Sequence, residues 1–79
     1  MMNQVKDFIK EQIKIVAFKN VGDDELLLKS KLLDSIVVVD LAVSIEEKYD
    51  IKIPFTEINP DNFETVNTIV KYLNKKGII

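Results

Sequence analysis

Apolar residues recur at steps of three and four in the first part of the chain, separated by polar and charged residues. This spacing places the apolar residues on one side of a helix and the charged residues on the other. We therefore expect an amphipathic helix over about residues 3–18, with Asn3 as its N-cap. The inward face of this helix comprises Val5, Phe8, Ile9, Ile13 and Val16.

A second apolar-rich segment covers residues 35–49. Its three consecutive valines favour a strand locally, because β-branched side chains suit an extended backbone. The helical spacing nevertheless continues through Leu41, Ile45 and Tyr49, so we predict a helix capped at its start by Asp34 or Ser35. The expected inward stripe contains Ile36, Val39, Leu41 or Ala42, Val43, Ile45 or Glu46, and Tyr49.

The last third of the chain contains several residues that typically begin or end helices. Ile53-Pro54 predicts an extended passage, because the residue before proline avoids the helical region. Asn59 followed by Pro60 predicts the start of a short third helix. Thr65 is expected to cap a fourth helix, which ends near Gly77 and whose apolar face contains Val66, Ile69, Val70 and Leu73.

A long segment from about Lys19 to Leu33 separates the first two helices. Loops of this length in small domains are uncommon and tend to be functional or packed on themselves. This one is rich in leucine, so we expect it to lie on the core as a lid. Its leucines are Leu26, Leu27, Leu28, Leu32 and Leu33.

These elements predict an all-α fold, a small four-helix bundle with three main helices, a short third helix and a long loop between the first two. We find no internal repeat and no linker, so we expect residues 1–79 to form a single domain. A domain this short has little core to spare, which favours a function carried out at its surface.

Composition removes several classes of function. The chain has no cysteine and no histidine. Disulfides, thiolate zinc sites, cysteine nucleophiles and the commonest general base are therefore excluded. The longest wholly apolar run, residues 36–39, is far shorter than the ~18 residues of a membrane span, and the start of the chain lacks a signal-peptide pattern. We expect a cytoplasmic monomer that does not insert into membranes.

Charge is distributed unevenly along the chain, although the net charge is only −2. Residues 1–22 and 65–79 are basic, whereas residues 23–64 hold eleven acids and four lysines. A partner that meets the middle segment should therefore be basic, and nucleic acid is a poor candidate for that surface.

Asp34-Ser35 is by itself a weak signal, because either residue is a common helix cap. Its context is more specific. The leucine-rich loop precedes Asp34-Ser35-Ile36, and a helix follows that ends in Ile45-Glu46-Glu47-Lys48-Tyr49, with Ile51-Lys52-Ile53-Pro54 after it. In this order the chain resembles the acyl and peptidyl carrier proteins, and the resemblance extends over about residues 3–76.

The resemblance implies a role for Ser35. A separate phosphopantetheinyl transferase would attach 4′-phosphopantetheine from coenzyme A to its hydroxyl. The terminal thiol of this arm would then carry an acyl or aminoacyl group as a thioester between partner enzymes. The protein would be a substrate of other enzymes and not a catalyst. A phosphodiester at Ser35 also suits the start of a helix, where an anion is favoured.

The resemblance further implies a recognition surface on the second helix. Asp34 would position the serine in the transferase, and Ile36 and Val37 would contribute apolar docking. Further acids would meet Lys or Arg on partner enzymes, which include an acyl- or aminoacyl-activating ligase and downstream transferases or synthases. These acids are Asp40, Glu46 and Glu47.

Two features depart from the family pattern. Family members usually have a glycine two or three residues before the aspartate, where this chain has Leu32 and Lys31. Fatty-acid carriers typically place an acid just after Ile36, where this chain has Val37 and Val38. The Leu-Leu-Asp-Ser sequence and the long stretch after Pro54 make the chain more similar to D-alanyl carriers and to stand-alone carriers of specialised pathways.

Three alternative hypotheses concern Ser35 or the acids in the loop before it. Ser35 could be a catalytic nucleophile with Lys31 as its base, although the missing histidine argues against this. The protein could be a helical adaptor that binds partners without a covalent arm, with Ser35 only a cap. Asp23, Asp24 and Glu25 could bind calcium, although they lack the alternating spacing and glycine of a calcium loop.

Overall fold

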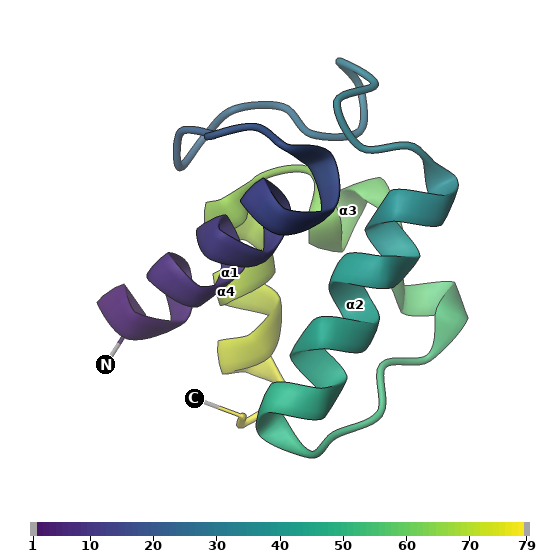
Figure 1. Ribbon diagram of the computed structural model, residues 1–79. Helices are drawn as coiled ribbons and strands as arrows, with labels where there is room; N and C mark the ends of the chain where they lie inside the picture. The colour runs from purple at the N-terminus through teal and green to yellow at the C-terminus, as the bar shows by residue number, and fades with distance from the viewer. Residues whose placement is uncertain (1, 79) are drawn as a thin grey trace.

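The computed structural model describes residues 2–78 and shows an all-helical molecule within that range (Figure 1). The predicted all-α bundle with a short third helix is therefore confirmed. A one-turn 3-10 helix, η1, after Pro54 was not predicted. The elements are α1 (Met2–Ala17), α2 (Ser35–Tyr49), η1 (Phe55–Glu57), α3 (Pro60–Phe63) and α4 (Val66–Lys75).

The helices surround one hydrophobic core. α1 packs against both α2 and α4, and the short α3 packs against α4. The loop between α1 and α2 arches over one end of the helices and leads into the start of α2 (Figure 1). Most of the predicted inward residues of α1 and α4 are fully buried, including Ile9, Ile13, Ile69 and Leu73. Burial of each such side chain contributes about 1.5–3 kcal/mol.

Side-chain caps fix three of the helix starts as predicted. Asp34 caps α2, Asn59 caps α3 and Thr65 caps α4. The Asn59 and Thr65 side chains accept the amides of Asn62 at 3.1 Å and Thr68 at 3.0 Å. Asn3 falls inside α1, which begins at Met2, so its prediction as an N-cap is wrong.

The end of α4 shows why Gly77 follows it. Gly77 has φ of +76°, and its amide donates to the carbonyl of Asn74 at 3.0 Å. The amide of Ile78 donates to the carbonyl of Leu73 at the same distance. This pair of bonds satisfies carbonyls that the helix leaves free, and glycine adopts the left-handed conformation without steric cost.

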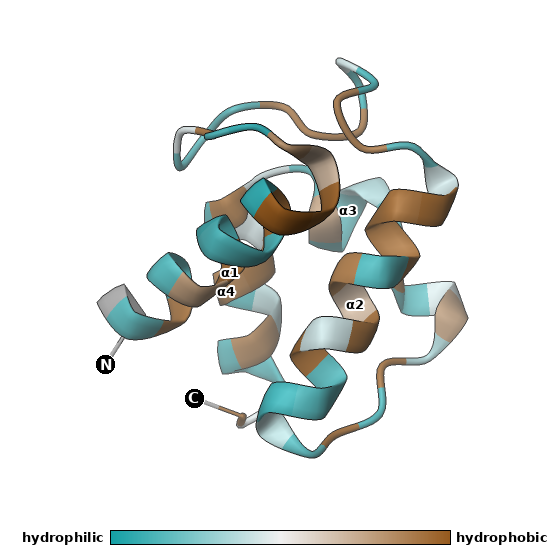
Figure 2. Cartoon of the chain, in the orientation of Figure 1, coloured by the Kyte–Doolittle hydropathy of each residue, from teal (hydrophilic) through white to brown (hydrophobic). Residues whose placement is uncertain are grey.

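The predicted inward stripe of α2 is partly wrong. The buried residues are Val38, Leu41, Ala42 and Ile45, whereas Ile36 is 72% exposed and Val43 44% exposed. Hydrophobic residues, shown in brown, dominate the N-terminal half of this helix (Figure 2). Because apolar residues occupy several sides of the helix, their spacing alone does not identify the side that faces the core.

The long loop packs on the core as predicted. Leu27 and Leu33 are fully buried, Leu28 and Leu32 pack against the core at its margin, and Leu26 remains 47% exposed. The carbonyl of Asp23 accepts the amide of Asn67 at 3.0 Å, which ties the loop to α4.

Asp23 also ties the loop to α1, because its carboxylate pairs with Lys6 and Lys10. The hydrogen bonds from Lys10 and Lys6 hold the pKa of Asp23 below its ordinary value. Two helices that lie apart in the sequence therefore hold the same part of the loop.

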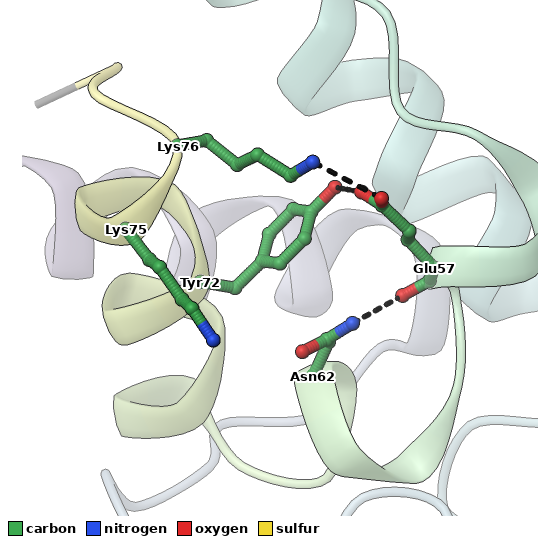
Figure 3. Close-up of a pocket in the computed structure, with 5 residues that line it drawn as sticks. All are labelled: Glu57, Asn62, Tyr72, Lys75 and Lys76. Carbon is green, nitrogen blue, oxygen red and sulfur yellow. Dashed lines mark hydrogen bonds and ion pairs between the residues drawn. The ribbon is translucent and has the colours of Figure 1, made fainter.

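Tyr72 connects α4 to η1 (Figure 3). Its hydroxyl donates to Glu57 Oε1 at 2.5 Å, and Lys76 Nζ donates to Glu57 Oε2 at 3.0 Å. These bonds lower the pKa of Glu57, while burial and the Glu57 carboxylate raise the pKa of Tyr72. The three side chains line a hollow of about 300 Å³ together with Asn62 and Lys75.

Lys31 occupies a backbone conformation that suits glycine. Its φ is +61°, and its amide donates to the carbonyl of Leu28 at 3.0 Å. A left-handed conformation costs a residue with a Cβ atom about 1–2 kcal/mol, and glycine avoids this cost. The departure from the family's glycine therefore places a strained residue in the loop before Ser35.

We expect Lys31→Gly to raise the free energy of unfolding by about 1 kcal/mol, because it relieves this strain. Urea unfolding followed by circular dichroism measures the change. Lys29→Gly is the matched control in the same loop, since Lys29 has no positive φ. It should leave stability unchanged or lower it. Equal effects of the two substitutions would contradict the strain assigned to Lys31.

We expect the stabilising contribution of the Glu57 charge to disappear in acid. Because folding lowers the Glu57 pKa from 4.5, the contribution is present above that pH and declines as the pH falls below it. Glu57→Gln should therefore be less stable than wild type at pH 7, with the gap closing towards pH 3. Urea unfolding at both pH values, with Glu47→Gln as a control for charge loss, tests this. A gap that persists in acid would contradict it.

Candidate functional site

Ser35 lies at the junction between the long loop and α2, where the chain turns from irregular backbone into helix (Figure 1). It is the first residue of the helix and is exposed to solvent. Within residues 2–78, its hydroxyl forms no hydrogen bond. The oxygen is therefore free to react with an incoming group.

Asp34 holds the start of α2 immediately before this serine. Its backbone is extended, and its Oδ1 accepts the amides of Ile36 at 3.0 Å and Val37 at 2.9 Å. Its carbonyl accepts the amide of Val38 at 3.0 Å, which is the first bond of the helix. Of the two predicted caps, Asp34 makes these bonds and leaves the hydroxyl of Ser35 uncommitted.

A phosphodiester on Ser35 fits this position. The positive end of the dipole of α2 lies there, and a helix N-terminus stabilises an anion by about 0.3–1 kcal/mol. Ser35 is exposed at this junction, so a long flexible arm attached to it can move in solvent. The residues present therefore suit a phosphopantetheine group, whose thiol would supply the sulfur chemistry that a chain without cysteine lacks.

The predicted recognition residues do not all share one surface. Ile36, Asp40 and Glu47 are exposed, and Val43, which was predicted to face the core, is exposed between them. Their positions differ by four, three and four, so these residues form one stripe along the outer side of α2. We call Ile36, Asp40, Val43 and Glu47 the outer stripe.

The other predicted recognition residues have structural contacts as well. Val37 is half-buried and packs against the core. Glu46 is half-buried, and its Oε2 accepts the amide of Ile53 at 2.7 Å. This bond holds the extended passage after α2 against the helix, so the Glu46 carboxylate is already engaged within the molecule.

Sequence reasoning missed Glu64, which lies in the short connection between α3 and α4. Only 9% of its surface is exposed, and its Oε2 accepts the amides of Leu28 at 2.8 Å and Lys29 at 3.0 Å. In the sequence Glu64 is one of eleven acids in the middle segment, and no local pattern distinguishes it from the exposed ones.

The acids proposed for calcium have other partners. Asp23 pairs with lysines of α1, Asp24 accepts the side-chain amide of Asn67 at 2.7 Å, and Glu25 accepts the amide of Gly22 at 3.0 Å. No group of three or more acidic side chains in the described part of the chain is arranged to hold a metal ion. Among residues 2–78, no helix is both long and apolar enough to cross a membrane.

Comparison with known proteins agrees with this geometry. The family described as "Phosphopantetheine attachment site" matches residues 3–73. The D-alanyl carrier protein of Streptococcus sanguinis is 35% identical over 69 residues, which cover 85% of this chain and 87% of the relative. Those of Streptococcus gordonii and Streptococcus thermophilus are each 36% identical with the same coverage.

These matches define the biochemical class. Carrier proteins of this kind hold 4′-phosphopantetheine covalently and are substrates of other enzymes, among them a phosphopantetheinyl transferase and acyl-activating ligases. The match covers the long loop, the start of α2 and most of α4. The chain belongs to the phosphopantetheine-attachment family of carrier proteins.

Proposed function

We propose that Ser35 bears the phosphopantetheine arm and that its thiol carries an acyl or aminoacyl group as a thioester between partner enzymes. The observation that carries this proposal is the exposed, uncommitted hydroxyl of Ser35 at the capped start of α2, inside the region that the family matches. The other serines, Ser30 and Ser44, donate their hydroxyls to backbone carbonyls.

The attachment reaction balances without any catalytic group from this chain. Ser35 Oγ attacks the phosphorus on the pantetheine side of the coenzyme A pyrophosphate and forms a new P–O bond. The P–O bond to adenosine 3′,5′-bisphosphate breaks, and the hydroxyl proton passes to a base of the transferase. The chain has no histidine that could act as this base, which agrees with its role as a substrate.

We further infer that the cargo is an aminoacyl group, with D-alanine as the leading candidate. Three relatives at 35–36% identity are named D-alanyl carrier proteins. Val37 and Val38 stand where fatty-acid carriers typically have an acid, which supports a specialised role.

We propose that partner enzymes dock on the outer stripe, beside the arm. Its exposed apolar residues, Ile36 and Val43, alternate with the acids Asp40 and Glu47. The exposed Asp34 would extend this surface beyond Ser35, and the half-buried Val37 would add its exposed part beside Ile36. A partner that combines apolar contacts with Lys or Arg would match this pattern, and the charges would act mainly on the association rate. The contribution of Glu46 is limited by its bond to Ile53.

We expect coenzyme A and a promiscuous phosphopantetheinyl transferase to increase the intact mass by one phosphopantetheine. Ser35→Ala should abolish the shift because it removes the attacking oxygen. Ser30→Ala and Ser44→Ala are matched controls and should keep it. A shift that survives in Ser35→Ala would move the attachment site elsewhere. No shift in wild type with any transferase would overturn the carrier assignment and favour an adaptor without an arm.

We expect reversal of an outer-stripe charge, in Asp40→Lys or Glu47→Lys, to lower the kcat/KM of the transferase by up to about fivefold each. An exposed ion pair contributes only about 0–1 kcal/mol, and added salt should shrink the effect. Glu11→Lys on the exposed side of α1 is the matched control. Equal rates for all three variants would contradict docking on this stripe.

We also expect Val43→Ser to lower kcat/KM without a large loss of stability, because Val43 is 44% exposed. Ile15→Ser on α1 is the control, since Ile15 is an exposed aliphatic residue at 56%. Transferase kinetics and thermal unfolding of both variants provide the comparison. If both substitutions change the kinetics equally, the apolar part of the stripe has no role in docking.

A further inference from the structure

Glu64 is the only buried charged residue among residues 4–78, whose side chains the structure describes. Its carboxylate reaches across to the long loop, where Oε2 accepts the amides of Leu28 at 2.8 Å and Lys29 at 3.0 Å. Its own backbone carbonyl accepts the amide of Leu27 at 2.7 Å. One residue therefore binds three consecutive amides of the loop.

This arrangement needs an explanation beyond packing. The second oxygen, Oε1, is buried and has no hydrogen-bond partner within the described part of the chain. Burial of a carboxylate is unfavourable unless its hydrogen bonds compensate, and an apolar residue would fill the same space without that cost. The carboxylate accepts hydrogen bonds from the amides of Leu28 and Lys29, and an apolar residue at this position would leave both amides without this acceptor.

The loop transmits this anchoring towards Ser35. The carbonyl of Leu27 accepts the amide of Leu33 at 2.9 Å, which closes the segment between them into a compact ring. The side chains of Leu27 and Leu33 are both buried in the core. Leu33 immediately precedes Asp34, the cap of α2. Both ends of the 27–33 segment are therefore fixed. Glu64 holds the first end, and the burial of Leu33 and its bond to Leu27 hold the second end, close to Ser35.

We propose that Glu64 is a positioning residue for the modification of Ser35. Its carboxylate holds residues 27–33 in the shape that the phosphopantetheinyl transferase binds. This inference rests on the proposed attachment at Ser35. Glu64 takes no part in the chemistry, because it acts on loop amides and is buried away from solvent.

We expect loss of the Glu64 carboxylate to raise the KM of the transferase for this protein while leaving kcat nearly unchanged. Without the carboxylate, the loop samples other shapes, and only the competent fraction binds. Apparent affinity falls by that fraction, so a competent population of about one tenth raises KM about tenfold. Once the complex has formed, Ser35 and coenzyme A have their normal geometry. The kcat should therefore stay within about twofold of wild type.

The test is transferase kinetics on full-length variants, with coenzyme A as the second substrate. Glu64→Ala removes the acceptor, and Glu64→Asp withdraws it from the two amides by one methylene. Both should raise KM about five- to tenfold. Glu64→Gln keeps an acceptor oxygen at the right reach and should restore KM to within about twofold of wild type. In Glu64→Ala, hydrogen exchange of the Leu28 and Lys29 amides should accelerate more than that of the core helices.

Thr65→Ala is the matched control, because it removes the neighbouring cap of α4 and leaves the loop amides bonded. It should lower stability while leaving KM unchanged. A KM for Glu64→Asp equal to that of wild type would overturn the proposal, as would an equal rise in Thr65→Ala. If Glu64→Ala does not fold, the KM of Glu64→Asp compared with that of Glu64→Gln still tests the proposal. Absence of any modification in wild type would instead reject Ser35 attachment.

Discussion

The hydrogen bonds from the amides of Ile36 and Val37 to the Asp34 carboxylate determine where α2 begins, and the position of Ser35 depends on them. A side-chain cap of this kind contributes about 1 kcal/mol. The cap matters more for the geometry of the site than for the stability of the fold. The cap bonds satisfy the first amides of the helix while leaving the neighbouring hydroxyl exposed and free of hydrogen bonds within residues 2–78.

The rest of the fold supports this junction from two directions. Below it, Val38 and Leu41 anchor α2 in the core. Before it, Leu33 is buried and the loop is tied to Glu64 and Asn67. A domain of this size has a thin stability margin, so it cannot maintain a deep active site. Presentation of one exposed residue on a rigid helix end needs only a small core.

Much of the fold follows from short-range rules. The caps at Asp34, Asn59 and Thr65 and the stop at Gly77 were predictable, because each depends on local backbone chemistry. The exposed side of α2 was not, because apolar residues occupy several sides of its N-terminal half and tertiary packing, including that against α1, selects the buried side. At the site, Ser35 and Asp34 were predicted from their order in the chain. Glu64 could not be, since its loop partners lie 35 and 36 residues away in the sequence.

We propose that Ser35 carries the arm in the cell. The most direct measurement is mass spectrometry of tryptic peptides from the protein isolated from its native source. Cleavage after Lys31 and Lys48 releases residues 32–48, which contain Ser35 and Ser44. We predict that this peptide carries phosphopantetheine, with fragment ions placing it on Ser35 and any retained thioester revealing the cargo. An arm located on Ser44, or a peptide that is always unmodified, would contradict the account.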